Sequence, residues 1–218
     1  MSGPNDRLIS ELVDDLAPVR PLPRLRSAFS IVLAVWATML GVVLLTLQHQ
    51  PGARGLLANP VYFASFAGLV MAALGGTLSA LAAGRPGRTK LEVGGLLVCV
   101  AGLLAAVVAC LIGMGGLDLA QHPSPPGLDA MCFREGAFLS LLPAGVVLSF
   151  LVRGWTARPI RAALAAAIAA AALGASVVHL SCDFLGPRHL LMGHLSVPIV
   201  LGALALYPLG VLLRRLRG

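Results

Sequence analysis

The side chains of this chain that could do chemistry are concentrated in one short stretch, HLSCDFLGPRHLLMGH, residues 179–194. The stretch holds one thiol, one carboxylate and three imidazoles, which are Cys182, Asp183, His179, His189 and His194. Thiolate and imidazole are ligands that soft and borderline metal ions prefer, and thiols are also the groups that oxidants attack. The stretch is therefore either part of a metal or redox site or a polar junction between two hydrophobic helices.

A second thiol, Cys132, lies near the end of a Pro-rich connection, DLAQHPSPPGLDAMCFRE, residues 118–135, which we expect to be irregular and which also contains His122. Three interpretations of Cys132 and Cys182 stay open: a structural disulfide, a reversible thiol pair that reports oxidant, or a metal site completed by histidines. The sequence contains no CxxC and no HExxH motif. Any metal site must therefore be assembled from separate segments.

The histidines differ in their expected surroundings. His179 precedes Cys182 by three residues, so both belong to the last turn of one helix. His189 and His194 are five residues apart, which places them about 140° apart on an α-helix. We therefore expect no chelate from this helix alone, with His189 facing lipid headgroups and His194 bonded within the bundle. Pro198 removes the backbone hydrogen bond to the carbonyl of His194 and predicts a loosened turn, interpreted as a packing kink.

The elements that position these residues are membrane helices. Of the 218 residues 58% are hydrophobic and 11% are charged, with a mean hydropathy of +0.90, whereas soluble domains carry about 25% charged residues. Six apolar stretches are long enough, or nearly so, to cross about 30 Å of hydrocarbon. They are 29–47, 61–83, 93–117, 136–152, 162–181 and 190–213. Abundant Gly and Ala within them favour close packing, so we expect an all-α, six-helix integral membrane bundle.

The basic residues predict the orientation of the bundle. They precede the first stretch, fill the connections 84–92 and 153–161, and end the chain. Of the 16 Lys and Arg residues, only Arg54, Arg134 and Arg188 fall in the other connections. Because cytoplasmic loops are enriched in Lys and Arg, both termini are predicted to be cytoplasmic and both outer thiols to face the opposite side. We interpret the net charge of +7 as an orientation signal beside anionic lipid, with no direct contact to nucleic acid.

Residues 1–28 form the cytoplasmic segment and linker, and residues 29–218 the six-span domain. Leu8, Ile9, Leu12, Val13 and Leu16 make one apolar stripe, which predicts a short amphipathic helix ended by Pro18. Its opposite face carries Glu11, Asp14 and Asp15. Helices that lie on membranes prefer basic polar faces, so docking into a groove on a cytoplasmic protein is favoured over binding to the bilayer.

Other functions lack their motifs. Charged residues are nearly absent from the spans, which disfavours an ion or proton pathway. Nucleophile–base triads, Gly-rich phosphate loops and paired carboxylates are missing as well, so we expect neither an enzyme nor a bound cofactor. The alternative to a binding protein is a membrane thiol-redox protein or a small transporter. Cys99 and Cys110 lie among apolar residues and are interpreted as inert packing residues.

Three segments resemble one family: LISELVDDLAPVRPL near the N-terminus, MCFREGAFLSLLP, and HLSCDFLGPRHLLMGHLSVP. Together with six spans they resemble the NrsF family of bacterial inner-membrane anti-sigma factors. The resemblance implies that the cytoplasmic segment sequesters an extracytoplasmic-function sigma factor, and that Cys132 and Cys182 sense heavy-metal or oxidative stress. It places the sigma-factor contacts around Leu8, Ile9, Leu12, Asp15, Leu16 and Val19. His122, His179, His189 and His194 remain candidate auxiliary ligands.

Overall fold

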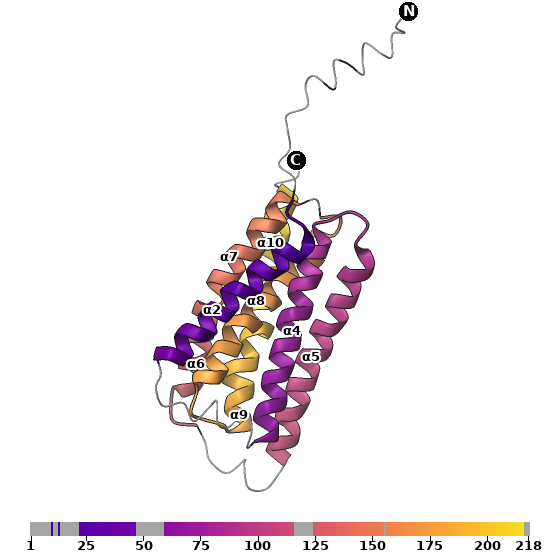
Figure 1. Ribbon diagram of the computed structural model, residues 1–218. Helices are drawn as coiled ribbons and strands as arrows, with labels where there is room; N and C mark the ends of the chain where they lie inside the picture. Colours follow the sequence, from indigo (N-terminus) through magenta and orange to yellow (C-terminus); the bar gives the residue numbers. More distant parts are fainter. Residues whose placement is uncertain are drawn as a thin grey trace, which may run out of the picture.

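The computed structural model describes residues 10, 13, 22–46, 59–115, 124–154 and 156–215. These residues form helices, with no strand among them. The elements are α2 (Leu25–Thr46), α4 (Pro60–Ala83), α5 (Thr89–Gly115), α6 (Leu128–Leu139), α7 (Leu141–Arg153), α8 (Pro159–Ser181), α9 (Pro187–His189), the π-helix η1 (Leu190–Leu195) and α10 (Ser196–Arg215). They run up and down one bundle, and the start of α2 and the end of α10 lie at the same end (Figure 1).

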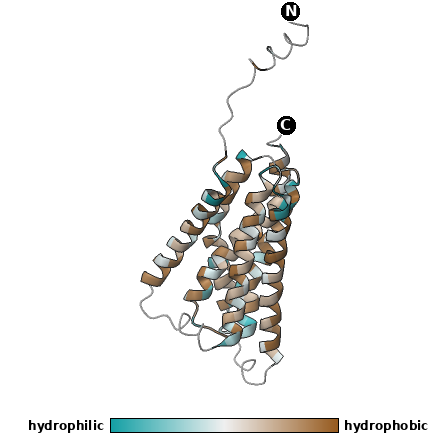
Figure 2. Cartoon of the chain, turned by 45° about the vertical axis from the view of Figure 1, so that its right-hand side comes forward, coloured by the Kyte–Doolittle hydropathy of each residue, from teal (hydrophilic) through white to brown (hydrophobic). Residues whose placement is uncertain are grey.

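The prediction of six apolar helices is confirmed. Six helices are long and apolar enough to cross a membrane: Leu25–Thr46, Pro60–Ala83, Thr89–Gly115, Leu128–Arg153, Pro159–Ser181 and Pro187–Leu213. Hydrophobic residues cover their lengths, and hydrophilic residues gather toward the ends of the bundle (Figure 2). The structure thus has the form of a multi-pass membrane protein.

Helix α8 is the centre of the bundle. In its apolar stretch 89% of the residues are buried, and its sequence is dominated by alanine. Small side chains let neighbouring backbones approach closely, which replaces the hydrophobic driving force that lipid cannot supply. A Cβ added at Gly174 of α8 would lie 2.5 Å from the carbonyl oxygen of Gly136 in α6. Any side chain at Gly174 would therefore push α6, which carries Cys132, away from α8.

Helices α4 and α5 also pack through close approach of their backbones at glycine residues. A Cβ at Gly75 would lie 2.6 Å from the backbone nitrogen of Cys99 and from the carbonyl oxygen of Gly95. Cys99 and Cys110 are fully buried on this side of α5, in agreement with their interpretation as packing residues. These two thiols lie outside the group of metal-binding candidates formed by the described residues.

The fourth span begins earlier than expected and contains a break. The expected start was residue 136, with 118–135 as an irregular connection, but α6 begins at Leu128 and includes Cys132. The error arose because Asp129, Arg134 and Glu135 gave the first turns a polar character. The break between α6 and α7 lies at Ser140, since Pro143 removes a backbone donor and crowds the carbonyl three to four residues earlier.

Helix α2 is the peripheral element. Only 11% of its apolar stretch is buried, and its buried residues are Ala28 and Val32, both in its first half. Toward Thr46 the helix diverges from the other helices (Figure 2). Two polar contacts hold it: Trp36 Nε1 donates to Ser176 Oγ at 3.0 Å, and Arg85 Nη2 donates to the carbonyl of Pro23, just before α2, at 3.0 Å.

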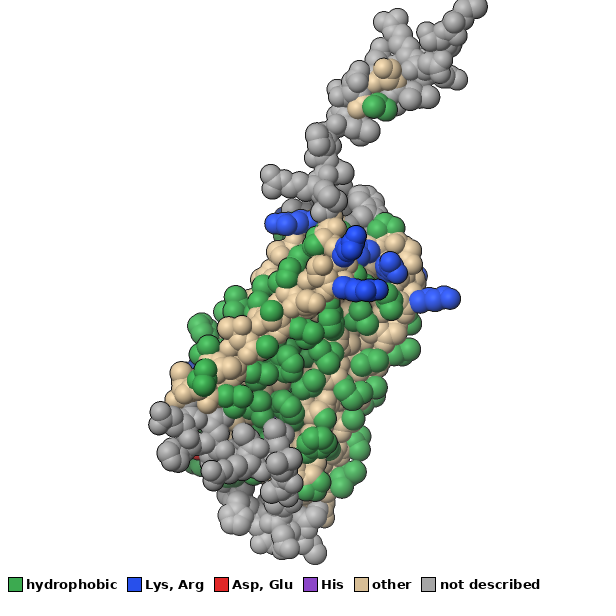
Figure 3. Space-filling view, viewed as in Figure 1, with side chains coloured by type: hydrophobic (Ala, Val, Ile, Leu, Met, Phe, Trp, Pro, Cys, Tyr) green, Lys and Arg blue, Asp and Glu red, His purple; other side chains and the backbone are tan. Residues whose placement is uncertain are grey.

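Lys and Arg side chains gather at the end of the bundle where α2 begins (Figure 3). The buried carboxylate of Glu92 lies 3.6 Å from Arg161 Nε and further ties this end together. Of the predicted amphipathic N-terminal helix the structure describes only Ser10 and Val13, which are helical and exposed. The sigma-factor positions Leu8, Ile9, Leu12, Asp15, Leu16 and Val19 lie outside the described residues.

Candidate thiol and imidazole site

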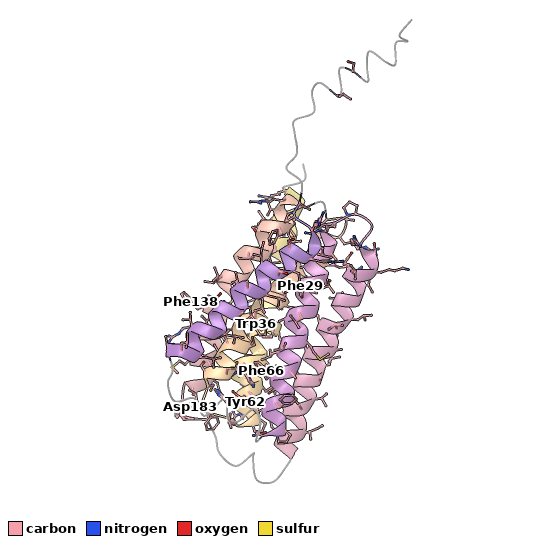
Figure 4. The ribbon with its side chains drawn as sticks, in the orientation of Figure 1. Phe29, Trp36, Tyr62, Phe66, Phe138 and Asp183 are labelled. Carbon is pink, nitrogen blue, oxygen red and sulfur yellow. The ribbon has the colours of Figure 1, made fainter. Side chains whose placement is uncertain are left out.

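The chemistry-bearing residues gather at the end of the bundle opposite to the basic end. Helix α8 ends there with Cys182 as its C-cap residue, α6 begins there, and α9 and η1 start the last span there (Figure 1). Asp183, Tyr62 and Phe66 lie in the same region (Figure 4). Segments that are far apart in the sequence thus converge at one place.

The two thiols predicted as a pair do lie together. Cys132 Sγ and Cys182 Sγ are 3.9 Å apart, although the residues are separated by 50 positions in the sequence. Both cysteines are free thiols, and their exposed fractions are 3% for Cys132 and 8% for Cys182. Val178, Leu128 and Phe184 pack around them. The pair is therefore shielded from bulk water.

The expectation that His189 and His194 diverge is wrong. Residues Leu190–Leu195 form a π-helix, in which the Ser196 N–H donates to the carbonyl of Leu191, five residues earlier. The i→i+5 hydrogen bond of such a turn brings residues five apart toward the same face of the helix, and the two Nε2 atoms lie 3.2 Å apart. The loosened turn predicted at Pro198 lies next to this π-turn. The interruption of the helix brings His189 and His194 together, so it is more than a packing kink.

His189 is a central residue of the site. The expectation that it faces lipid headgroups is wrong, since its side chain is fully buried. Its Nδ1 lies 2.5 Å from Asp129 Oδ1, and its Nε2 lies 3.2 Å from Cys182 Sγ. Nδ1–H donates a hydrogen bond to the carboxylate, so we assign the tautomer in which Nε2 has a free lone pair facing Cys182 and His194. The phenyl ring of Phe184 meets the imidazole edge-on, with centroids 5.3 Å apart.

His179 forms a second layer behind these residues. Its ring stacks on that of Tyr62 with centroids 4.1 Å apart, and it meets His194 edge-on at 5.1 Å. Its Nε2 lies 3.2 Å from the carbonyl oxygen of Tyr62, while the Tyr62 hydroxyl donates to the carbonyl of His179. His179 therefore fixes the orientation of His194 and lies apart from the thiols.

Four side chains can offer ligand atoms to one metal ion: Cys132, Cys182, His189 and His194. Their donor atoms all lie within 4.8 Å of one another, and all four residues are buried. Of the remaining candidate ligands, His179 belongs to the second layer and His122 lies outside the described residues. Of the three candidate histidines that the structure describes, His189 and His194 belong to this group and His179 does not.

Cys182 directly follows the last residue of α8, in the connection between two spans. A hydrogen bond there stabilises the thiolate form of its side chain. The pKa of Cys182 lies below its usual value chiefly because the Cys132 thiol donates a hydrogen bond to its sulfur. Burial acts in the opposite direction and is outweighed. Cys182 is therefore the thiol of the pair that more readily becomes a thiolate, the form that attacks oxidants and binds metals.

A cleft of about 370 Å³ leads from the surface to the thiols. Cys132 and Cys182 form part of its wall, and Ser181, Asp183 and Glu135 are among its other lining residues. Asp183 and Glu135 are exposed, so the cleft has an acidic rim, which attracts cations. Ions and small oxidants thus have a route to the thiols.

Sequence reasoning missed three residues of the site: Asp129, Phe184 and Gly193. Asp129 lies one helical turn before Cys132 and could have been found if the helix had been predicted to begin at 128. A Cβ at Gly193 would lie 3.1 Å from His189 Cε1 and 3.3 Å from Cys132 Cβ. Nothing in the residue pattern signalled that Gly193 must be small, because the requirement arises from the fold.

One comparison with known proteins matches nearly the whole chain. Residues 12–215 match the family described as NrsF, negative regulator of sigma F. Comparison with curated proteins and with solved structures gave no match. The match spans all six apolar helices and both clustered thiols, and the chain therefore belongs to the NrsF family of negative regulators of a sigma factor.

Proposed function

We propose that this protein is an anti-sigma factor of the bacterial inner membrane, which holds an extracytoplasmic-function sigma factor through its N-terminal segment. Both termini are cytoplasmic in this proposal, and the thiols of Cys132 and Cys182 face the periplasm. Heavy-metal or oxidative stress acts on these thiols and releases the sigma factor. The chain acts by binding and carries out no catalysis.

The observation that carries this proposal is the 3.9 Å separation of the two thiols at the end of the bundle opposite to the start of α2. A sensor of periplasmic stress must place its reactive group on one side of the membrane and its partner-binding segment on the other. The basic residues around the start of α2 support the cytoplasmic assignment of that end (Figure 3). The exposed acidic residues Asp183 and Glu135 are at the thiol end.

One chain of contacts connects the two ends. Helix α8 carries Cys182 at its end and Ser176 less than two turns earlier, and Ser176 bonds to Trp36 of α2. The Trp36 side chain lies midway along α2 (Figure 4). Helix α2 continues backward into residues 22–24 and then into the N-terminal segment. Because α2 is loosely packed elsewhere, a shift of α8 or α6 can change its position at low cost.

Thiol chemistry would move these helices. A disulfide has an S–S length of about 2.0 Å, so oxidation would draw the two sulfurs about 1.9 Å closer than the 3.9 Å of the free thiols. The reaction forms one S–S bond and transfers two electrons to the oxidant, with loss of two protons from the thiols. Since Cys132 lies on α6 and Cys182 follows α8, the closure acts on the contact between those helices.

The sigma-factor contact is tested with the full chain purified from its own bacterium in mild detergent. Leu12 lies on the apolar stripe of the N-terminal helix, and Leu12→Asp should reduce the amount of copurified sigma factor by about 30-fold, the effect of losing a central apolar anchor. The matched control is Glu11→Gln on the opposite face, which should retain the sigma factor. If the unaltered chain brings down no sigma factor, the proposal is wrong.

A further inference from the structure

We propose that Cys132, Cys182, His189 and His194 form a closed tetrahedral site for one Zn²⁺ ion, or for its heavier congener Cd²⁺. The site combines two thiolates from α6 and the end of α8 with two imidazoles presented by the π-turn of the last span. The role of the ion as a stress signal rests on the proposed function, whereas its binding to the chain does not.

The separations of the donor atoms fit a tetrahedral ion. With Zn–S of about 2.3 Å and Zn–N of about 2.0–2.1 Å, tetrahedral geometry requires S···S of about 3.8 Å, S···N of about 3.6 Å and N···N of about 3.3 Å. The corresponding distances are 3.9 Å for Cys132–Cys182, 3.2 Å for Cys182–His189 and 3.2 Å for His189–His194. All four donor atoms lie within 4.8 Å of one another, so binding would draw the more widely separated donors inward to these values.

The hydrogen-bonding pattern of the site is incomplete in the absence of an ion. Since its Nδ1–H donates a hydrogen bond to Asp129, His189 has a single lone pair on Nε2, but Cys182 Sγ and His194 Nε2 both lie 3.2 Å from that atom. One lone pair cannot serve two neighbours in different directions. The Nδ1 atom of His194, which is fully buried, has no hydrogen-bond partner among the described residues. An ion bound by both sulfurs and by Nε2 of both histidines would remove the competition at His189 Nε2.

Asp129 provides the outer support that metal-binding histidines usually have. A carboxylate bonded to the far ring nitrogen fixes the tautomer and makes the ligating nitrogen more basic. The separation of 2.5 Å between His189 Nδ1 and Asp129 Oδ1 gives that arrangement. The side chain of Asp129 is 31% exposed, so it can be replaced without opening a cavity in the bundle.

Charge and ligand type favour a divalent d¹⁰ ion. Two thiolates balance the charge of a divalent cation, and two neutral imidazoles add none, so the buried site is neutral when loaded. A tetrahedral S₂N₂ set is typical of zinc, and four protein ligands leave no open position for catalysis. The acidic rim of the cleft at Cys132 and Cys182 provides the entry path.

The test uses the full chain, purified in detergent and reduced, with Co²⁺ as the spectroscopic probe and Zn²⁺ and Cd²⁺ as competitors. We expect one Co²⁺ per chain, with thiolate-to-cobalt charge transfer and the intense visible bands of a tetrahedral ion, both abolished by one equivalent of Zn²⁺ or Cd²⁺. Cys132→Ser, Cys182→Ser and His194→Gln should abolish the signal. Asp129→Asn should weaken binding by about 10- to 100-fold while leaving the spectrum unchanged.

Cys99→Ser and Cys110→Ser are matched controls, because they remove equally buried thiols from another part of the bundle. Both should bind as the unaltered chain does. Absence of a thiolate band in the unaltered chain, or equal loss in the controls, overturns the metal site. Asp129→Asn keeps the test decisive if a ligand variant fails to fold, since full affinity in this variant also contradicts the site. Metal binding by a chain that captures no sigma factor would overturn only the proposed function.

Discussion

Trp36 Nε1 donates a hydrogen bond to Ser176 Oγ at 3.0 Å, and this bond joins the loosely packed α2 to the most deeply buried helix of the bundle. Ser176 lies three residues before His179 and six before Cys182 on the same element. The bond therefore gives α8 a direct polar contact with α2 close to the thiol site. Since α2 leads to the N-terminal segment, the bond connects the thiol site with the part of the chain proposed to bind the sigma factor.

The first prediction concerns this bond. Trp36→Phe and Ser176→Ala should each reduce the change in sigma-factor affinity that stress produces by about threefold, because a hydrogen bond between membrane helices contributes about 0.6 kcal/mol. Metal affinity measured without the sigma factor should stay unchanged. The measurement is sigma-factor binding to the reconstituted chain with and without Cd²⁺.

Thr38→Val is the control for this prediction, because Thr38 bonds to the carbonyl of Ala34 in its own helix at 2.8 Å. This variant should respond as the unaltered chain does. Loss of response in Thr38→Val equal to that in Trp36→Phe would show that any change in α2 has this effect. The specific role of the Trp36–Ser176 bond would then be wrong.

Much of the fold followed from composition and hydropathy. The order of the six apolar helices was predictable because each carries about twenty apolar residues, a requirement that bilayer thickness imposes on any spanning helix. The start of the fourth span was missed because Asp129, Arg134 and Glu135 resemble loop residues, yet the site end of α6 uses Asp129 as a ligand support and exposes Glu135. Polar residues can therefore belong to the first turns of a membrane helix when those turns carry a site, and they do not by themselves mark a loop.

The site was predicted only in part. Cys132 and Cys182 were identified as a pair, but the angular argument that separated His189 from His194 assumed an α-helix throughout. The π-turn changes which residues share a face. Pro198 predicted a loosened turn, but residue spacing did not reveal the close packing of Gly193 against His189 and Cys132. Asp129 and Phe184 were missed because they act through His189, whose burial was itself unexpected.

The second prediction tests the packing that the π-turn allows. Gly193→Ala should lower metal affinity by about tenfold or more, because the added Cβ presses on His189 and Cys132 at 3.1 Å and 3.3 Å. Gly145→Ala is the control, since a Cβ there meets nothing within 4 Å. Both variants are titrated with Co²⁺. Equal affinity in the two would contradict the close approach at Gly193.

The third prediction concerns orientation. Alkaline phosphatase folds only where its disulfides form, so a fusion at Gly127 should be active and a fusion at Gly218 inactive in intact cells. A fusion within the connection that contains Arg85 and Arg88 should be inactive as well. The opposite pattern would place the thiols in the cytoplasm and contradict a role in sensing periplasmic stress.

The most direct test of the account measures the sigma factor bound to the full chain in bilayer nanodiscs, before and after addition of Cd²⁺ or a mild oxidant. The account predicts that affinity falls by about tenfold or more in the unaltered chain, within the usual range of coupling between two sites. Cys99→Ser and Cys110→Ser should behave identically, while Cys132→Ser and Cys182→Ser should keep their sigma factor. Undiminished release from both Cys132→Ser and Cys182→Ser would contradict the claim that these thiols control the regulator.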